Sequence, residues 1–240
     1  MHRFAVEPEV ALAQRRLLGD ENIGTRAAKL IAAFYSVVDA VRAVVSATGV
    51  DLPEQEIASP AKQDVEDRGW WTITELKSLG YRAPREMSRT DFLRRCVTVA
   101  ILIERLHEGA LRQVATGIGV SPKQVKELKT LGLLGVLAVV GELAKESGLR
   151  LSDAANELAA RWNKDRRIPA VKVLFAGREL RTLASHATEK SAQQRVDQNL
   201  RDLGIDPDAQ RNGWGTAVDQ LYERMSAALE EIARLLREAC

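Results

Sequence analysis

The segment SPKQVKELKT, Ser121–Thr130, carries the kinds of side chain that bind DNA bases and phosphates. Lysine binds guanine edges or phosphates, glutamine pairs with an adenine edge, and glutamate accepts a hydrogen bond from cytosine. If the segment is helical, Val125 and Leu128 face inward and the polar side chains face outward. The predicted DNA-binding residues here are Ser121, Lys123, Gln124, Lys126, Glu127 and Thr130, flanked by Arg112 and Lys129 as phosphate contacts.

Two short helices joined by a glycine turn would position these side chains. Ala115 is small enough to let the helices cross closely, and Gly119, four residues later, can adopt the positive φ of a tight turn. Ser121 and Pro122 are typical of a helix start. The remaining inward positions of the motif are apolar: Val114, Ile118, Val120, Val125 and Leu128. The pattern predicts a helix-turn-helix, and a hairpin used for packing alone remains the alternative.

The window LRQVATGIGVSPKQVKEL, 111–128, resembles the helix-turn-helix superfamily of bacterial DNA-binding proteins. With its flanks, from Ile101 to Leu134, it is similar to the corresponding region of ParB-type partition proteins. The resemblance implies recognition of specific sequences in double-stranded DNA. The expected role is regulation of transcription, or organisation of DNA on a plasmid, phage or chromosome.

A second basic segment precedes the motif, in WWTITELKSLGYRAPREMSR, 70–89. It resembles the start of a MerR-type winged helix through Thr72, Ile73, Glu75, Leu76, Gly80, Pro84 and Arg85. The resemblance implies a helix, a glycine turn and a second helix that presents Arg82, Arg85 and Arg89 to DNA. A solvated helix end is the alternative.

A third basic segment, 161–181, holds seven basic residues against only Asp165 and Glu179. We expect Lys164, Arg166 and Arg167 to bind phosphates, because so few acids balance them. An ordinary charged surface is the alternative reading of this segment.

Enzymatic chemistry has little support in the sequence. The spacing from Arg181 to His186 is similar to that of the helical HEPN ribonucleases, which implies RNA cleavage, although Thr182 stands where those enzymes usually carry a polar amide or acid. His2, His107 and His186 are the only histidines, and neither they nor Cys96 and Cys240 form a metal-ligand pattern. We therefore expect no enzyme, no cofactor and no metal.

Composition favours helices. The chain has 240 residues, 5% aromatics and a formal net charge of only +2, so any DNA contact must come from local patches. Helical spacing predicts helices over 25–48, 90–107 and 214–240, and a buried helix over 131–144. Pro169 starts either a helix or a short strand, 171–175. The predicted fold is mostly α, with a central helix-turn-helix and a long C-terminal amphipathic helix.

The predicted organisation follows from the breaks between these helices. Pro53, Pro60 and many charges predict a loop or linker at 53–69. It would separate an N-terminal helical segment, 1–52, from a helical DNA-binding region, 70–210, with its motif at 111–130. Helix ends are predicted at Gly80, Gly132 and Gly204, each after a similar phrase of the type LKSLGY.

The C-terminal helix has apolar residues at alternating steps of three and four, from Trp214 to Leu235. This spacing predicts a coiled-coil seam for a homodimer or a partner protein through 214–238, or else packing on the chain's own core. No apolar run approaches the roughly 20 residues of a membrane span, and 1–10 lacks a secretory apolar core. We expect a cytoplasmic, nucleoid-associated protein that binds double-stranded DNA. A helical adaptor within a larger nucleic-acid-processing complex is the first alternative.

Overall fold

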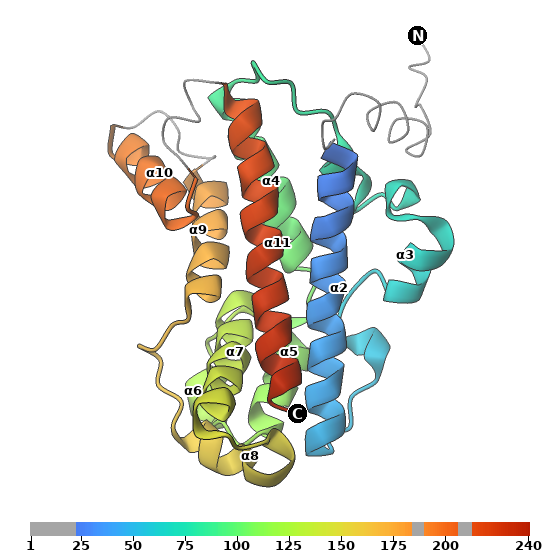
Figure 1. Cartoon of the computed structure of the whole chain (residues 1–240), viewed down its shortest axis with the longest axis vertical. Coiled ribbons are helices and arrows are strands. Elements are labelled where there is room, and N and C mark those ends of the chain that lie inside the picture. Colours follow the sequence, from blue (N-terminus) through green and yellow to red (C-terminus); the bar gives the residue numbers. More distant parts are fainter. Residues whose placement is uncertain (1–22, 184–189, 206–212) are drawn as a thin grey trace.

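The computed structural model describes residues 23–183, 190–205 and 213–240, and all their regular structure is helical (Figure 1). This confirms the prediction of a mostly α protein. The α-helices are α2 (Ile23–Thr48), α3 (Lys62–Arg68), α4 (Arg89–Ile103), α5 (Glu108–Gly117), α6 (Pro122–Val125), α7 (Thr130–Ser147), α8 (Leu151–Ala160), α9 (Pro169–Leu183), α10 (Lys190–Asp202) and α11 (Trp214–Glu238). Short 3₁₀ turns lie at Glu54–Glu56, Trp70–Thr72 and Lys77–Gly80.

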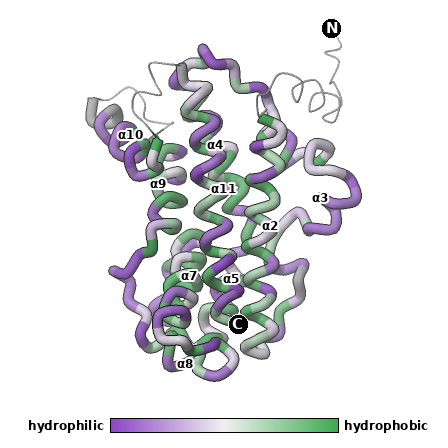
Figure 2. The backbone as a smooth tube through the Cα atoms, viewed as in Figure 1, coloured by the Kyte–Doolittle hydropathy of each residue, from purple (hydrophilic) through white to green (hydrophobic). Residues whose placement is uncertain are grey.

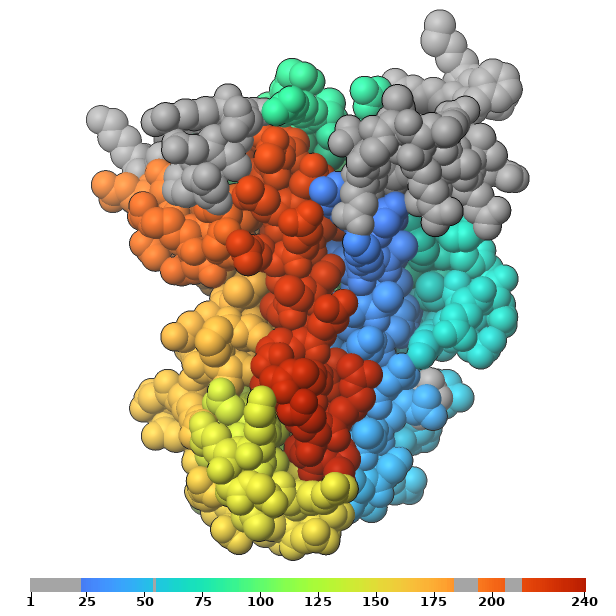
Figure 3. Space-filling model, viewed as in Figure 1, coloured from blue at the N-terminus to red at the C-terminus, as the bar shows by residue number. Residues whose placement is uncertain are grey.

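The C-terminal helix α11 is the central element of the fold. It runs along α2 for much of its length and also contacts α4, α7 and α9. Figure 3 shows it between α2 on one side and α9 on the other. Its predicted apolar stripe is buried, from Val218 to Leu235. The stripe is therefore used in the chain's own core, and pairing through it would require α11 to leave that core.

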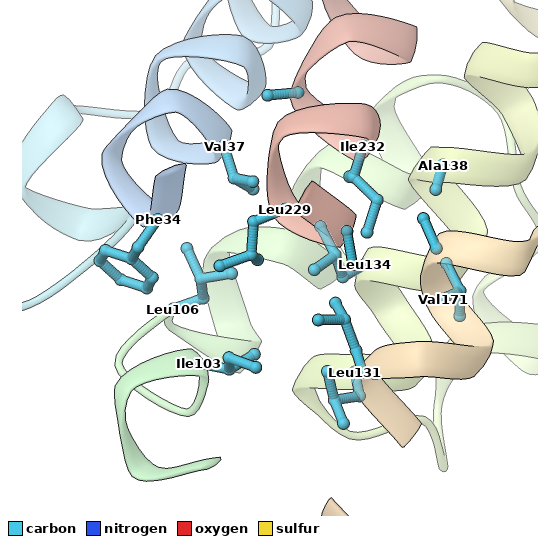
Figure 4. Packing of buried hydrophobic residues seen from close by; sticks show 14 of the residues in the cluster. Phe34, Val37, Ile103, Leu106, Leu131, Leu134, Ala138, Val171, Leu229 and Ile232 are labelled. Atoms are coloured by element: carbon cyan, nitrogen blue, oxygen red, sulfur yellow. The ribbon is translucent and has the colours of Figure 1, made fainter. Parts of the chain in front are cut away.

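One hydrophobic cluster extends from Ala27 to Ala239 and joins the helices. Figure 4 shows side chains of α2, α7, α9 and α11 meeting around Leu229. In Figure 2, α2 and α7 are largely hydrophobic, whereas α10 is largely hydrophilic. The segment 1–52, predicted as a separate N-terminal segment, thus contributes α2 to the same core as the central motif.

The predicted linker at 53–69 is tied to the body of the protein. Ile57 and Ala58 are buried, and the Ile57 carbonyl accepts a hydrogen bond from the backbone N–H of His107 at 2.8 Å. The Ser59 N–H donates to the Arg105 carbonyl at 3.1 Å, and α3 follows. The segment is a packed connection that holds the start of α5 against α2.

The helical hairpin predicted at 70–89 is wrong, because this segment forms 3₁₀ turns and an extended stretch. Its apolar residues Ile73, Leu76 and Leu79 are spaced by three and all are buried. Leu79 lies in the second 3₁₀ turn of the segment, and hydrogen bonds of the 3₁₀ type, three residues apart, join Leu76 to the Ile73 carbonyl and Leu79 to the Leu76 carbonyl. Gly80 and Pro84 then prevent a longer helix.

Several helix boundaries were predictable and others were not. Ser88 caps α4 by accepting from the backbone N–H of Asp91, and Pro169 starts α9, so the helix alternative holds there. Gly204 has the positive φ of a helix end, +67°. Gly132, however, lies inside α7, because the buried leucines on either side continue the helix. Gly80 ends only a 3₁₀ turn and does not have a positive φ.

Among the described residues, α2 is a helix long and apolar enough to cross a membrane, judged by length and composition. The absence of an apolar run of that length, predicted from the sequence, is therefore corrected for α2. More than half of its most apolar stretch is buried inside the protein, where α2 packs on α11. The apolar character of α2 is therefore matched by its position in the core.

Tyr222 gives the core a pH dependence. Its hydroxyl is buried and donates to the Leu79 carbonyl at 2.8 Å, and burial raises the pKa of Tyr222 to about 12. The neutral phenol is thus favoured in the folded state. Its stabilisation is present below the unfolded pKa of about 10 and is lost as the pH rises from there toward 12.

Tyr222→Phe is expected to remove this alkaline sensitivity. At neutral pH the variant should lose about 1 kcal/mol, the usual contribution of one hydrogen bond. Between the two pKa values, the wild type should lose up to about 1.4 kcal/mol per pH unit more than the variant. Urea unfolding across this range measures both. Parallel pH profiles would show that Tyr222 ionises as easily in the folded chain as in the unfolded one.

Candidate nucleic-acid interface

The central motif folds as two helices joined at a glycine turn. Gly119 has a φ of +100°, which an L side chain rarely adopts, and α5 and α6 lie on either side of it. Ala115 and Val125 are completely buried, as are Val114 and Ile118. Ser121 immediately precedes α6, and Pro122 is its first residue. The inward packing was therefore predicted correctly at these positions, whereas Leu128, also predicted to face inward, is only half-buried and lines a groove.

The second helix is shorter than expected. α6 covers only Pro122–Val125, a single turn. Arg112 closes it by donating to the carbonyls of Val125 at 3.4 Å and Leu128 at 2.8 Å, while it pairs with Glu108 at 2.7 Å. This hydrogen bond from Arg112 holds the pKa of Glu108 below its usual range. Arg112, predicted as a phosphate contact, is thus used to end α6.

Thr130 was predicted to point outward, and this is wrong. Its side chain is buried, with its hydroxyl 3.5 Å from the Leu106 carbonyl. The reason is that α6 ends before Thr130 and α7 begins there, so Thr130 follows the geometry of a different helix. The first residue of α7 faces the core.

The other polar residues of the motif are exposed: Ser121, Lys123, Gln124, Lys126, Glu127 and Lys129. Lys129 lies 3.7 Å from Glu108, but its side chain is still 71% exposed. Lys123 and Lys126 have no ion pair within the described part of the chain. The turn and its short helix thus present an excess of positive charge to solvent.

A groove of about 100 Å³ joins the motif to the third basic segment. Leu128 and Gly132 line one side of it, and Trp162, Lys164 and Arg167 line the other. The Arg167 guanidinium lies 5.1 Å from the centre of the Phe175 ring. Residues 164–167 therefore lie beside the end of the motif, although about forty residues separate them along the sequence.

The basic residues of this third segment do not all remain available. Arg166 pairs with Glu142 at 2.9 Å and with Glu146 at 2.5 Å, and these hydrogen bonds, that to Glu146 first, raise its pKa. Lys164 and Arg167 are exposed and have no ion pair among the residues described. Of the three predicted phosphate contacts here, two are therefore free to bind an anion.

The segment with Arg82, Arg85 and Arg89 lies elsewhere. Arg82 and Arg85 are exposed and Arg89 is half-buried. The Arg85 carbonyl accepts from the backbone N–H of Gly215, in the first turn of α11. The motif lies beside α7, whose Gly141 packs on Leu235, about 30 Å further along α11 at 1.5 Å per residue. The structure does not bring these arginines to the motif.

Comparison with known proteins gives no relative. No family model, curated protein or solved structure matches this chain. The motif's resemblance to helix-turn-helix proteins therefore depends on the residues and the geometry described above.

The structure does not bring together the residues considered for RNA cleavage or metal binding. Arg181 pairs with Glu104, and His186 lies outside the described residues. The His107 ring is 2.9 Å from the Glu56 carbonyl, which ties it to the 53–69 connection. Cys96 is buried, and its burial raises the pKa of the thiol. Within the described ranges no cluster of three His, Cys, Asp or Glu side chains could hold a metal ion.

The groove beside the motif was not predicted from the sequence. Gly132 and Gly135, which line it, are spaced by three in α7 and leave room for Leu128 and Val171. That spacing of glycines within a buried helix is the signal that was available. The segment after α8, which forms the rest of the groove, could be located only from the tertiary structure.

Proposed function

We propose that this protein binds double-stranded DNA through one surface, here called the motif surface. It consists of the exposed residues Lys123, Gln124, Lys126, Glu127, Lys129, Lys164 and Arg167. The observation that carries the proposal is that Lys164 and Arg167 border a groove that also reaches Leu128, at the end of the motif, although these segments are distant in sequence. Such a surface suits a polyanion whose phosphates are spaced along two strands.

The short α6 limits how many bases this surface reads. Only Lys123 and Gln124 lie within the exposed turn of helix, with Lys126 just after it. Lysine would bind guanine edges or phosphates and glutamine an adenine edge. Lys164 and Arg167, on the far side of the groove, would bind the phosphate backbone. The proposed surface would therefore contact few bases and would gain most of its affinity from the phosphates.

Within this proposal the biological role is regulation of transcription or organisation of DNA in the cytoplasm. Both need a protein that finds duplex DNA by charge and then prefers certain sequences. Selection of bound duplexes from a random pool would show whether a preferred sequence exists and whether it contains paired half-sites.

The test replaces Lys123, Lys126, Lys164 and Arg167 together by alanine. If each binds one phosphate, the slope of log affinity against log salt concentration should fall by about 3.6, since each phosphate contact contributes about 0.9. Fluorescence anisotropy with a labelled duplex, repeated over several salt concentrations, measures the slope. Affinity at low salt should fall at the same time.

A matched control removes as many positive charges from other faces. The control replaces Arg68, Lys77, Arg201 and Arg224, all exposed, by alanine. It should keep a slope close to that of the wild type. Equal slopes for the two fourfold variants, or no duplex binding by the wild type at low salt, would refute the proposal and favour the adaptor alternative.

A further inference from the structure

A second groove lies between the outer face of α4 and the 3₁₀ segment that precedes it. Its volume is about 420 Å³, within the range typical of small-ligand sites. Tyr81, Arg82 and Met87 line one side, and Asp91, Arg94 and Arg95 of α4 line the other. The motif surface does not use any of these residues.

The wall that carries Tyr81 is held in place from inside the protein. Arg95 is only 8% exposed, and its guanidinium donates to the carbonyls of Ser78, Leu79 and Tyr81, the last at 2.7 Å. The hydroxyl of Tyr222 donates to the same Leu79 carbonyl. These bonds fix the turn, so the groove has a defined shape before any ligand binds.

The Tyr81 side chain stands at the edge of this groove and is unusually open. Tyr81 is 56% exposed, and it and Trp71 are the exposed large hydrophobic residues of the described chain. The backbone of Tyr81 is fixed by Arg95, whereas its ring is exposed to solvent. Such a ring can stack on another planar ring. Met87 and Pro84 add apolar surface beside it.

The charge of the groove is positive. It has three arginines and a single acid, Asp91. Asp91 lies 3.2 Å from Arg94, and a hydrogen bond from Ser88, followed by the charge of Arg94, lowers its pKa. Arg82 is exposed and has no ion pair in the part of the chain that the structure describes. Arg82 is therefore placed to bind an anionic group, whereas Arg94 already pairs with Asp91.

We propose that this groove binds a nucleoside phosphate, either free or as part of a single strand. The base would stack on Tyr81, and the phosphate would pair with Arg82. A simple anion would not use the open ring, and an apolar ligand would leave Arg82 without a partner. The proposal does not depend on duplex binding, because no residue of the motif surface lines this groove.

The experiment measures binding of two probes, adenosine monophosphate by calorimetry and a labelled six-residue oligothymidylate by anisotropy. Tyr81→Ala should weaken binding about tenfold or more, while Tyr81→Phe, which keeps the ring, should stay within about twofold. Arg82→Ala should weaken binding and reduce its salt dependence. Trp71→Ala removes the other exposed aromatic side chain, outside the groove, and should have no effect.

The two probes separate the sources of the ligand. Equal affinities would identify a free nucleotide, and a clearly tighter oligonucleotide would identify a single strand. The Arg68→Ala/Arg201→Ala variant, which removes two exposed charges outside the groove, should bind both probes as the wild type does. If neither probe binds at low salt, or if Tyr81→Ala and Arg82→Ala bind normally while folded, the proposal is overturned.

Discussion

Replacing Leu229 by alanine is expected to lower the free energy of unfolding by about 2–5 kcal/mol. Leu229 of α11 is completely buried, and in Figure 4 it lies among Val37, Leu106 and Leu134. Its side chain thus joins three other parts of the chain. Truncation would remove buried apolar surface and leave a cavity that three helices cannot easily close. Denaturant unfolding followed by circular dichroism measures the change.

Two control variants separate cavity formation from other effects at this position. Leu229→Met keeps the volume and should cost less than about 1.5 kcal/mol. Glu230→Ala alters the next, exposed residue of α11 and should change stability by no more than about 0.5 kcal/mol. A loss of under about 1 kcal/mol for Leu229→Ala would contradict the central position of α11.

Gly119→Ala is expected to destabilise the protein by about 3 kcal/mol or more. Two costs combine at this position. Its φ of +100° strains any residue with a Cβ atom, and that atom would also collide with the Asn156 side chain and lie 3.1 Å from its Cα. The turn of the motif and α8 are packed too closely for a methyl group. Thermal and denaturant unfolding should both report the loss.

Gly148→Ala is the matched comparison for Gly119→Ala. Gly148 ends α7 with a φ of +65°, and nothing lies within 4 Å of a Cβ atom built there. Only backbone strain applies, so the expected cost is about 1 kcal/mol. Adding Asn156→Ala to Gly119→Ala should recover part of the larger cost, because it removes the colliding side chain. Similar losses at the two glycines would show that the collision with Asn156 is easily relieved.

The sequence predicted the long helices well because their patterns are local. The apolar spacings of α2 and α11 each lie within a single helix. The glycine turn at Gly119 was predictable for the same reason, since the small residue, the glycine and the aliphatic positions occupy one short window.

What could not be predicted depends on contacts between distant segments. Nothing near Thr130 in the sequence shows that α6 stops after one turn, because Arg112 ends it from the preceding helix. The neutralisation of Arg166 depends on Glu142 and Glu146, which face it from α7. The exposed charge of a predicted DNA-binding segment is therefore set partly by acids outside that segment.

The 70–89 segment shows a related difficulty. Its resemblance to a winged-helix start came from residue types, but the step of three between Ile73, Leu76 and Leu79 favoured a tighter turn. Its arginines then proved to be of two kinds. Arg82 stays in solvent at a groove, whereas Arg89 is half-buried near the start of α4.

The pairing of α2 with α11 has a consequence for how this protein is made. α2 ends at Thr48 and α11 runs from Trp214 to Glu238. At roughly 5–20 residues per second, a ribosome would need roughly 10–40 s to synthesise the chain between the end of α2 and the end of α11. Throughout that interval the apolar face of α2 has no α11 to cover it. During synthesis, the apolar face of α2 is therefore open to non-native contacts until translation reaches the last helix of the bundle.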